Sequence, residues 1–233
     1  MGLKEDLQDD VADIFKTRWS TRDGYVVPLT DSVKMGNDAV ILKEAVVLYA
    51  DLAASTQLVN TRESWFAAEV YKAYLRCASK IIRSHQGEIT AFDGDRVMAV
   101  YLGDRKNSNA TLTALKIAYA VERIINPAIA KQFSNANYKV RQVVGIDRSA
   151  LFIARTGIRG SNDLVWVGRA ANYAAKLCAI REEDYTSYIT ADVYKMLSTD
   201  VKVSSVNESQ MWEKRFWKER GIDIYCFKWQ QEF

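Results

Sequence analysis

Two aspartates stand where apolar stretches of the sequence meet turn-forming residues. Asp51 follows the apolar run at 45–50 and precedes small and hydroxyl residues, while Asp95 ends the segment Asp93-Gly94-Asp95. Carboxylates without histidine or thiolate neighbours suit hard cations such as Mg²⁺ or Mn²⁺ and suit zinc poorly. Two such ions can activate an attacking oxygen and neutralise a leaving phosphate. If the two aspartates meet in the fold, we expect metal-assisted phosphoryl transfer.

The local sequence also allows a simpler interpretation of each aspartate. A single aspartate at the end of a strand is more often a turn former or a helix cap than a metal ligand. An Asp-Gly pair between apolar segments signals a hairpin, because glycine readily takes the positive φ that a tight turn requires. The surrounding elements therefore decide whether the two residues can share a site.

Apolar periodicity predicts a β-α-β-β-α-β order for the middle of the chain. The segment at 39–50 is rich in β-branched residues, which indicates a buried strand. Asn60-Thr61-Arg62-Glu63 predicts a helix start, with apolar residues at helical spacing up to Gly87. The further elements are strands at 88–92, 96–102, 138–146 and 151–154 and a helix at 108–125. This order predicts a ferredoxin-like α+β fold, in which an antiparallel-rich sheet flanked by helices brings Asp95 beside the end of the first strand.

The remaining sequence adds elements at both ends of this core. We expect helices at 168–180 and 190–197 and strands at 201–206 and 222–229. Residues 1–38 predict a helix at 4–19 and a turn-rich loop, which together form an N-terminal helical appendage. Only two prolines and no Gly/Ser-rich stretch are present, so a flexible linker is not expected. Residues 39–233 are therefore interpreted as one domain.

Composition excludes several classes of function. The 233 residues are 48% hydrophobic and 26% charged, as in an ordinary globular domain, and no apolar run approaches the roughly 18 residues that cross a membrane. The acidic N-terminus does not resemble a secretory signal, so we expect a cytoplasmic protein without membrane contact. A formal charge of +3 with interspersed acids and bases gives no case for nucleic-acid binding. Three scattered cysteines and one histidine favour neither disulfides, nor zinc, nor Ser/His/Asp catalysis.

Three segments carry a resemblance to a known family. LYADLAAST, FDGDRVMAVY and VGRAANYAAKL resemble, in order, the two metal-binding segments and the transition-state helix of the class III nucleotidyl cyclases, with a weaker echo in KERGIDIYCF. The resemblance covers about residues 40–177. It implies the cyclase homology domain as the fold of the catalytic domain. It also implies two Mg²⁺ or Mn²⁺ ions held by Asp51 and Asp95, with help from a backbone carbonyl near Leu52.

The helix segment also has a physical interpretation. Asn172 and Lys176 are four residues apart and share a helix face. In the family, an Asn and an Arg at these positions reach across a dimer interface, where they orient the ribose and stabilise charge on the transferring phosphoryl group. Lys176 supplies the charge but not the planar fork of an arginine, and Arg169 is a candidate substitute. The resemblance thus implies a homodimer with active sites at its interface.

The implied reaction is attack of the 3′-hydroxyl of a nucleoside triphosphate on its own α-phosphorus, which gives a 3′,5′-cyclic nucleotide and pyrophosphate. In the family a basic residue near the last strands helps to bind the triphosphate. Lys218 and Arg220 are the candidates in this sequence.

Two positions bear on which nucleobase the substrate carries. Purine cyclases of the family read the base with a Lys or Glu four residues before the second metal ligand and a polar residue three before the helix glycine; here these are Ala91 and Val165. Neither side chain can hydrogen-bond a purine. Together with Tyr49 and Trp166, they resemble the pocket of the bacterial pyrimidine cyclases of the Pycsar antiphage system, and UTP is favoured over CTP. That resemblance implies a defence role and a separate effector protein that binds the cyclic nucleotide.

Three other functions stay open at this stage. An adenylate cyclase with an atypical base pocket would keep the chemistry and change the substrate. A catalytically inactive cyclase-like nucleotide-binding module is opposed by Asp51, Asp95 and Asn172, while Lys176 leaves it open. A ferredoxin-like nucleic-acid-binding module is less favoured, because no stripe of exposed aromatic residues with flanking bases is apparent on the strands.

Overall fold

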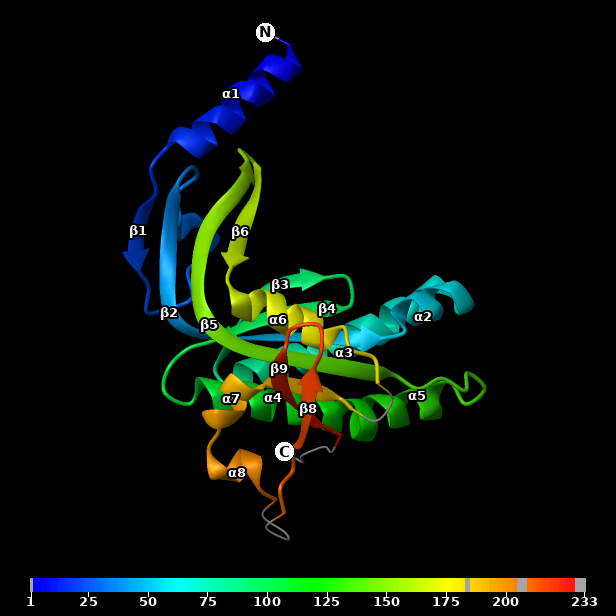
Figure 1. The fold of residues 1–233 in the computed structure, drawn as a ribbon. Helices are drawn as coiled ribbons and strands as arrows, with labels where there is room; N and C mark the ends of the chain where they lie inside the picture. Colours follow the sequence, from blue (N-terminus) through cyan, green and yellow to red (C-terminus); the bar gives the residue numbers. More distant parts are fainter. Residues whose placement is uncertain (1, 183–184, 205–208, 229–233) are drawn as a thin grey trace.

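A twisted mixed sheet organises the computed structural model, which describes residues 2–182, 185–204 and 209–228 (Figure 1). Its strands follow the order β3-β4-β2-β5-β7-β9-β8, with β1 paired to β2 and β6 paired to β5. The strands are β1 Ser20–Asp23, β2 Asp38–Ala53, β3 Gly87–Asp93, β4 Arg96–Tyr101, β5 Arg141–Ile158, β6 Ser161–Val167, β7 Ser187–Thr190, β8 Glu213–Trp217 and β9 Ile222–Phe227.

Helices cover both faces of this sheet. They are α1 Leu3–Lys16, α2 Ser55–Thr61, α3 Ser64–Ser84, α4 Lys106–Ala120, α5 Asn126–Gln132, α6 Arg169–Cys178, α7 Ala191–Lys195 and α8 Thr199–Lys202. Leu48 of β2 belongs to the core shared with α3 and α4, whereas its neighbour Val47 packs in the core shared with α6. The order β2-α3-β3-β4-α4-β5 and the strand arrangement β3-β4-β2-β5 confirm the predicted ferredoxin-like α+β fold.

Helix α6 lies against the sheet with its backbone in close contact. A Cβ atom added to Gly145 of β5 would lie 2.2 Å from the carbonyl oxygen of Ala174 and 2.4 Å from the backbone nitrogen of Cys178. These distances leave no room for a side chain, so only glycine allows this approach. The C-terminal end of α6 is thereby fixed over β5, beside the end of β2.

Several predicted elements differ from the observed ones. The predicted strand pair at 138–146 and 151–154 is the single strand β5, and β5 pairs instead with β6. The residues predicted to start α3, 60–63, run from the end of the separate helix α2 at Thr61 to the N-cap of α3 at Glu63, and α3 begins at Ser64. The predicted helix at 108–125 is observed as α4 followed by a π-helical turn at Val121–Ile125, which leads into α5. Pro127 lies in the first turn of α5, where its missing N–H is tolerated.

The end of the chain also departs from prediction. The segment predicted as a strand at 201–206 contains the last residues of α8, and residues 205 and 206 lie outside the described part. Strand β8 was not predicted. The predicted strand at 222–229 is observed as β9 up to Phe227, and Trp229 lies outside the described residues.

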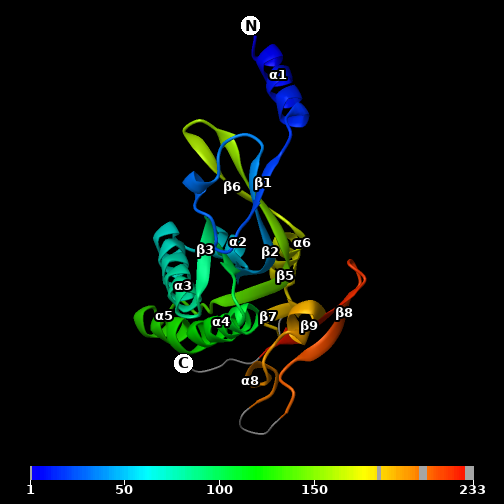
Figure 2. The same ribbon diagram turned by 90° about the vertical axis from the view of Figure 1, so that its left-hand side faces the viewer.

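The N-terminal segment only partly joins the domain. Helix α1 projects away from the sheet and has no buried residue (Figure 1 and Figure 2). Strand β1 adds in parallel to β2, pairing Ser20 with Asp38. Among the described residues, none of the helices has the length and apolar character required to cross a membrane.

Candidate active site

The antiparallel pairing of β2 and β4 brings the two predicted metal ligands together. Ala50 pairs with Val97, so Asp51 and Asp95 follow and precede these partners at the same edge of the sheet. The turn before β4 is tight because Gly94 adopts a φ of +61°. Burial and the nearby charge of Asp95 both raise the pKa of Asp51, so the two carboxylates interact electrostatically.

The pair has the donor chemistry of a site for a hard cation. Oδ2 of Asp95 is buried and has no hydrogen-bond partner among the described residues. A cation between the carboxylates would satisfy this oxygen and relieve their repulsion. Leu52 buries its side chain in the core beneath α3, so only its backbone can contribute to such a site. Within the described ranges, no group of three or more His, Cys, Asp or Glu side chains is placed so that it could hold a metal ion.

Arg181 is a site residue that the sequence did not reveal. Its Nη2 atom lies 2.7 Å from Oδ2 of Asp51, although 130 positions separate the two residues. The same guanidinium donates a hydrogen bond to the carbonyl of Cys178 at the end of α6. A cleft of about 630 Å³ adjoins this ion pair and is lined by Ala53, Arg141 and Arg181 among others.

The predicted transition-state residues lie apart from the carboxylate pair. Asn172 and Lys176 are both exposed on one face of α6. Neither side chain makes a hydrogen bond or ion pair within the described part of the chain. Within the described part of one protomer, they therefore form neither a hydrogen bond nor an ion pair with Asp51 or Asp95.

The residues predicted to surround the base are brought partly together. Ala91, Met98 and Tyr49 form a row across β3, β4 and β2, because Met98 pairs with both of the others. Trp166 packs with Ala91 and Tyr49 against the same hydrophobic cluster. Val165 lies on the opposite face of β6 and is 39% exposed. Three of the four predicted positions thus pack against the same hydrophobic cluster.

The basic residues predicted to bind the triphosphate lie beside α6. Lys218 and Arg220 belong to the turn between β8 and β9, and the Arg220 guanidinium lies 5.8 Å from the ring centre of Trp217. Trp217 contacts Tyr173 of α6 edge-on at 5.5 Å. The turn is thereby held near the helix that carries Asn172. Neither Lys218 nor Arg220 lines the cleft beside Asp51.

Comparisons with known proteins place this geometry in a family. No family model matches the chain. Proteins named uridylate cyclase from Xanthomonas perforans and Burkholderia cepacia are 46% and 48% identical to it over 231 residues, which is 99% of this chain and 98% and 99% of theirs. A bacterial light-regulated adenylyl cyclase has the same fold, with a TM-score of 0.68 and 21% identity over 82% of this chain and 93% of its own. The adenylyl cyclase CyaB from P. aeruginosa matches with a TM-score of 0.64 and 19% identity over 83% of this chain and 97% of its own.

The chain belongs to the class III nucleotidyl cyclases. In this cyclase, Arg169 has a structural environment of its own. Its Nε lies 3.1 Å from Oδ2 of Asp147, whose side chain is fully buried, and its Nη2 lies 2.7 Å from Asp192. Thr190 donates a further hydrogen bond of 2.6 Å to Asp147. Arg169 therefore holds the start of α6 to β5, whereas Lys176 has no such partner among the residues that the structure describes.

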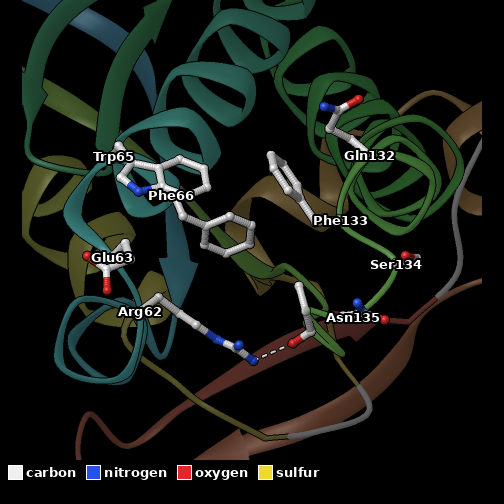
Figure 3. A pocket seen from close by; sticks show the side chains of 9 residues that line it. Arg62, Glu63, Trp65, Phe66, Gln132, Phe133, Ser134 and Asn135 are labelled. Carbon is white, nitrogen blue, oxygen red and sulfur yellow. Dashed lines mark hydrogen bonds between the residues drawn. The ribbon is translucent and has the colours of Figure 1, made fainter.

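A further cavity of the cyclase, of about 420 Å³, lies between the start of α3 and the segment after α5 (Figure 3). Arg62 closes one side by donating a 2.5 Å hydrogen bond to the carbonyl of Ala136. The rings of Phe66 and Phe133 meet at 5.2 Å on its apolar side. None of the residues predicted from the sequence to form the active site lines this cavity, so it has no assigned part in the reaction.

Replacing Arg169 by Ala in the cyclase should destabilise the fold. Burial raises the pKa of Asp147, and the substitution removes a charge that lowers it. We expect the free energy of unfolding at neutral pH to fall by about 1–3 kcal/mol, measured by chemical denaturation, because a buried carboxylate loses its charged partner. The buried Asp147 carboxyl with its raised pKa is destabilising only when it is ionised. The loss of unfolding free energy in Arg169→Ala should therefore shrink as the pH falls through the pKa of Asp147.

The matched control is Arg159→Ala in the exposed turn between β5 and β6, where a change within about 0.5 kcal/mol is expected. An Arg169→Ala deficit no larger than this control, or one that does not vary with pH, would contradict the charge pairing of Asp147.

Proposed function

We propose that the protein is a pyrimidine nucleotide cyclase that converts UTP to 3′,5′-cyclic UMP and pyrophosphate. The observation that carries this proposal is the meeting of Asp51 and Asp95 at adjoining strand ends, in a chain almost half identical over its length to proteins named uridylate cyclase. CTP is the second pyrimidine substrate considered.

Each chemical requirement of the reaction has a candidate residue. Bound between Asp51 and Asp95, two Mg²⁺ or Mn²⁺ ions would supply Lewis acidity to the 3′-hydroxyl and to the triphosphate. Asn172 would hold the ribose by hydrogen bonds, which orients the 3′-oxygen toward the α-phosphorus. Lys176 would stabilise the negative charge that develops on the α-phosphoryl oxygens as the bond to pyrophosphate breaks. Lys218 and Arg220 remain the candidates for holding the triphosphate.

The surface formed by Tyr49, Ala91 and Trp166 supports a pyrimidine substrate. Ala91 has no group that can hydrogen-bond the edge of a purine, and the Tyr49 ring is held from one side by Arg96, whose guanidinium lies 5.2 Å from the ring centre. Tyr49 can stack on a small base or donate a hydrogen bond to it. An adenylate cyclase with this atypical surface is the alternative, and an inactive nucleotide-binding module is the alternative without catalysis.

A homodimer would complete the site. Asn172 and Lys176 are exposed and unpaired among the described residues, whereas the carboxylate pair lies elsewhere in the same chain. A two-fold axis would place these α6 residues of each protomer against the carboxylates of the other and form two equivalent sites. The cyclic nucleotide would then act as a second messenger in the cytoplasm, where a separate effector protein binds it during antiphage defence.

Product analysis tests the proposed reaction. Purified protein incubated with ATP, GTP, CTP or UTP and Mn²⁺ should yield cyclic UMP as the dominant product by mass spectrometry. Turnover should be lost in Asp51→Ala and kept in Asp104→Ala, a matched exposed aspartate after β4. Cyclic AMP as the main product would favour the adenylate cyclase, and no cyclic product would favour the binding module.

Substitution of Tyr49 tests the base surface with the same assay. Tyr49→Ala should lower kcat/KM for UTP at least about tenfold relative to ATP, because the small base loses its aromatic contact. Tyr49→Phe separates the ring from the hydroxyl: retained preference indicates stacking, and lost preference indicates a hydrogen bond. Unchanged relative rates for all four nucleotides in both variants would remove Tyr49 from base recognition.

Mixing inactive variants tests the shared site. Asp95→Ala and Asn172→Ala should each be inactive alone, and their equimolar mixture after subunit exchange should recover about a quarter of wild-type activity, because half of the dimers hold one intact site of two. The matched control mixes Asp95→Ala with Asp51→Ala, in which every site keeps one defect. Recovery in the control, or none in the test mixture, would contradict a site built from two protomers.

A further inference from the structure

Arg181 links the end of α6 to the first metal ligand. It follows Cys178, the last residue of the helix, by three positions, and its guanidinium bonds both the Cys178 carbonyl and Oδ2 of Asp51. A basic side chain at a helix C-terminus also interacts favourably with the helix dipole. The arginine is therefore anchored on the helix while it reaches the carboxylate.

The carboxylate that Arg181 reaches needs a cation. The side chain of Asp51 is 18% exposed and lies near the charge of Asp95. An ionised carboxylate in such surroundings is unfavourable unless a positive charge compensates it. Among the residues that the structure describes, Arg181 is the one basic residue within ion-pair distance of Asp51. It therefore supplies the compensating positive charge when no metal ion is bound.

We propose that Arg181 is a displaceable counter-ion of Asp51, which holds the carboxylate before metal binding and leaves it when the metal ion arrives. This inference rests on the proposed metal site. A divalent cation on Asp51 and a guanidinium 2.7 Å from the same carboxylate repel each other, so both cannot bind it at full strength. The Arg181 side chain is already 37% exposed and borders the cleft of about 630 Å³, which gives it room to move.

This role differs from that of a permanent positioning residue in the sign of its effect on metal binding. A residue that merely orients Asp51 for the metal ion would strengthen metal binding, and its loss would weaken it. A displaceable counter-ion competes with the metal ion, so its loss strengthens metal binding and at the same time weakens the metal-free fold.

Metal titration of the full chain separates these possibilities. In Arg181→Gln, the dissociation constant for Mn²⁺, measured by the loss of the free-ion electron paramagnetic resonance signal, should fall by about tenfold or more. The metal-free variant should melt at a lower temperature than wild type, and Mn²⁺ should raise its melting temperature by more. Arg181→Lys, which keeps the charge, should stay close to wild type in both measurements.

The matched control is Arg215→Gln. Arg215 is 38% exposed and pairs with Glu182 and Glu213, so its loss changes charge and ion pairing without touching Asp51. Its Mn²⁺ affinity should equal that of wild type. Unchanged or weaker Mn²⁺ binding in Arg181→Gln would overturn the inference.

A second variant distinguishes failure of the inference from failure of the metal site. Asp51→Asn should abolish Mn²⁺ binding. If binding is lost in Asp51→Asn but is not strengthened in Arg181→Gln, the counter-ion role alone is wrong. If Mn²⁺ binding survives Asp51→Asn, the metal site between the carboxylates is wrong, and the inference falls with it.

Discussion

Mutual repulsion between two carboxylates, held at one edge of the sheet by the pairing of β2 with β4, is the constraint on which this site depends. Asp51 and Asp95 are brought together by backbone hydrogen bonds of the strands, whatever their charges prefer. Their proximity and burial raise the pKa of Asp51, and one oxygen of Asp95 has no partner among the described residues. The fold therefore maintains an arrangement that a cation stabilises, as a preorganised metal site requires.

Helix α6 connects this constraint to the rest of the active site. Gly145 lets the helix lie directly on β5, which places its C-terminal end near Asp51 and lets Arg181 reach that carboxylate. At the other end, Arg169 anchors the helix to the buried Asp147. The exposed face between these two anchors presents Asn172 and Lys176 to a second protomer in the proposed dimer. In the proposed dimer, α6 would contribute to its own carboxylate pair through one end and to the partner's pair through its exposed face.

Sequence patterns predicted those parts of the structure that depend on neighbouring residues. The Asp-Gly turn and the β-branched run before Asp51 led to the strands that bring the two aspartates together. Long-range compensation could not be predicted in this way. The sequence predicts separate strands at 138–146 and 151–154, yet β5 continues through Asp147, because Arg169 and Thr190 satisfy its buried carboxylate. The pairing of Arg181 with Asp51 spans 130 positions, and no local pattern signals it.

In the proposed reaction, Asp51 and Asp95 together hold the catalytic cations. Crystals grown with Mn²⁺ and a non-reactive UTP analogue, measured for anomalous scattering near the manganese absorption edge, test it most directly. We expect anomalous peaks bonded to both carboxylates, with the Arg181 guanidinium turned away from Asp51. Well-ordered carboxylates without a peak between them, with Arg181 still paired to Asp51, would contradict it.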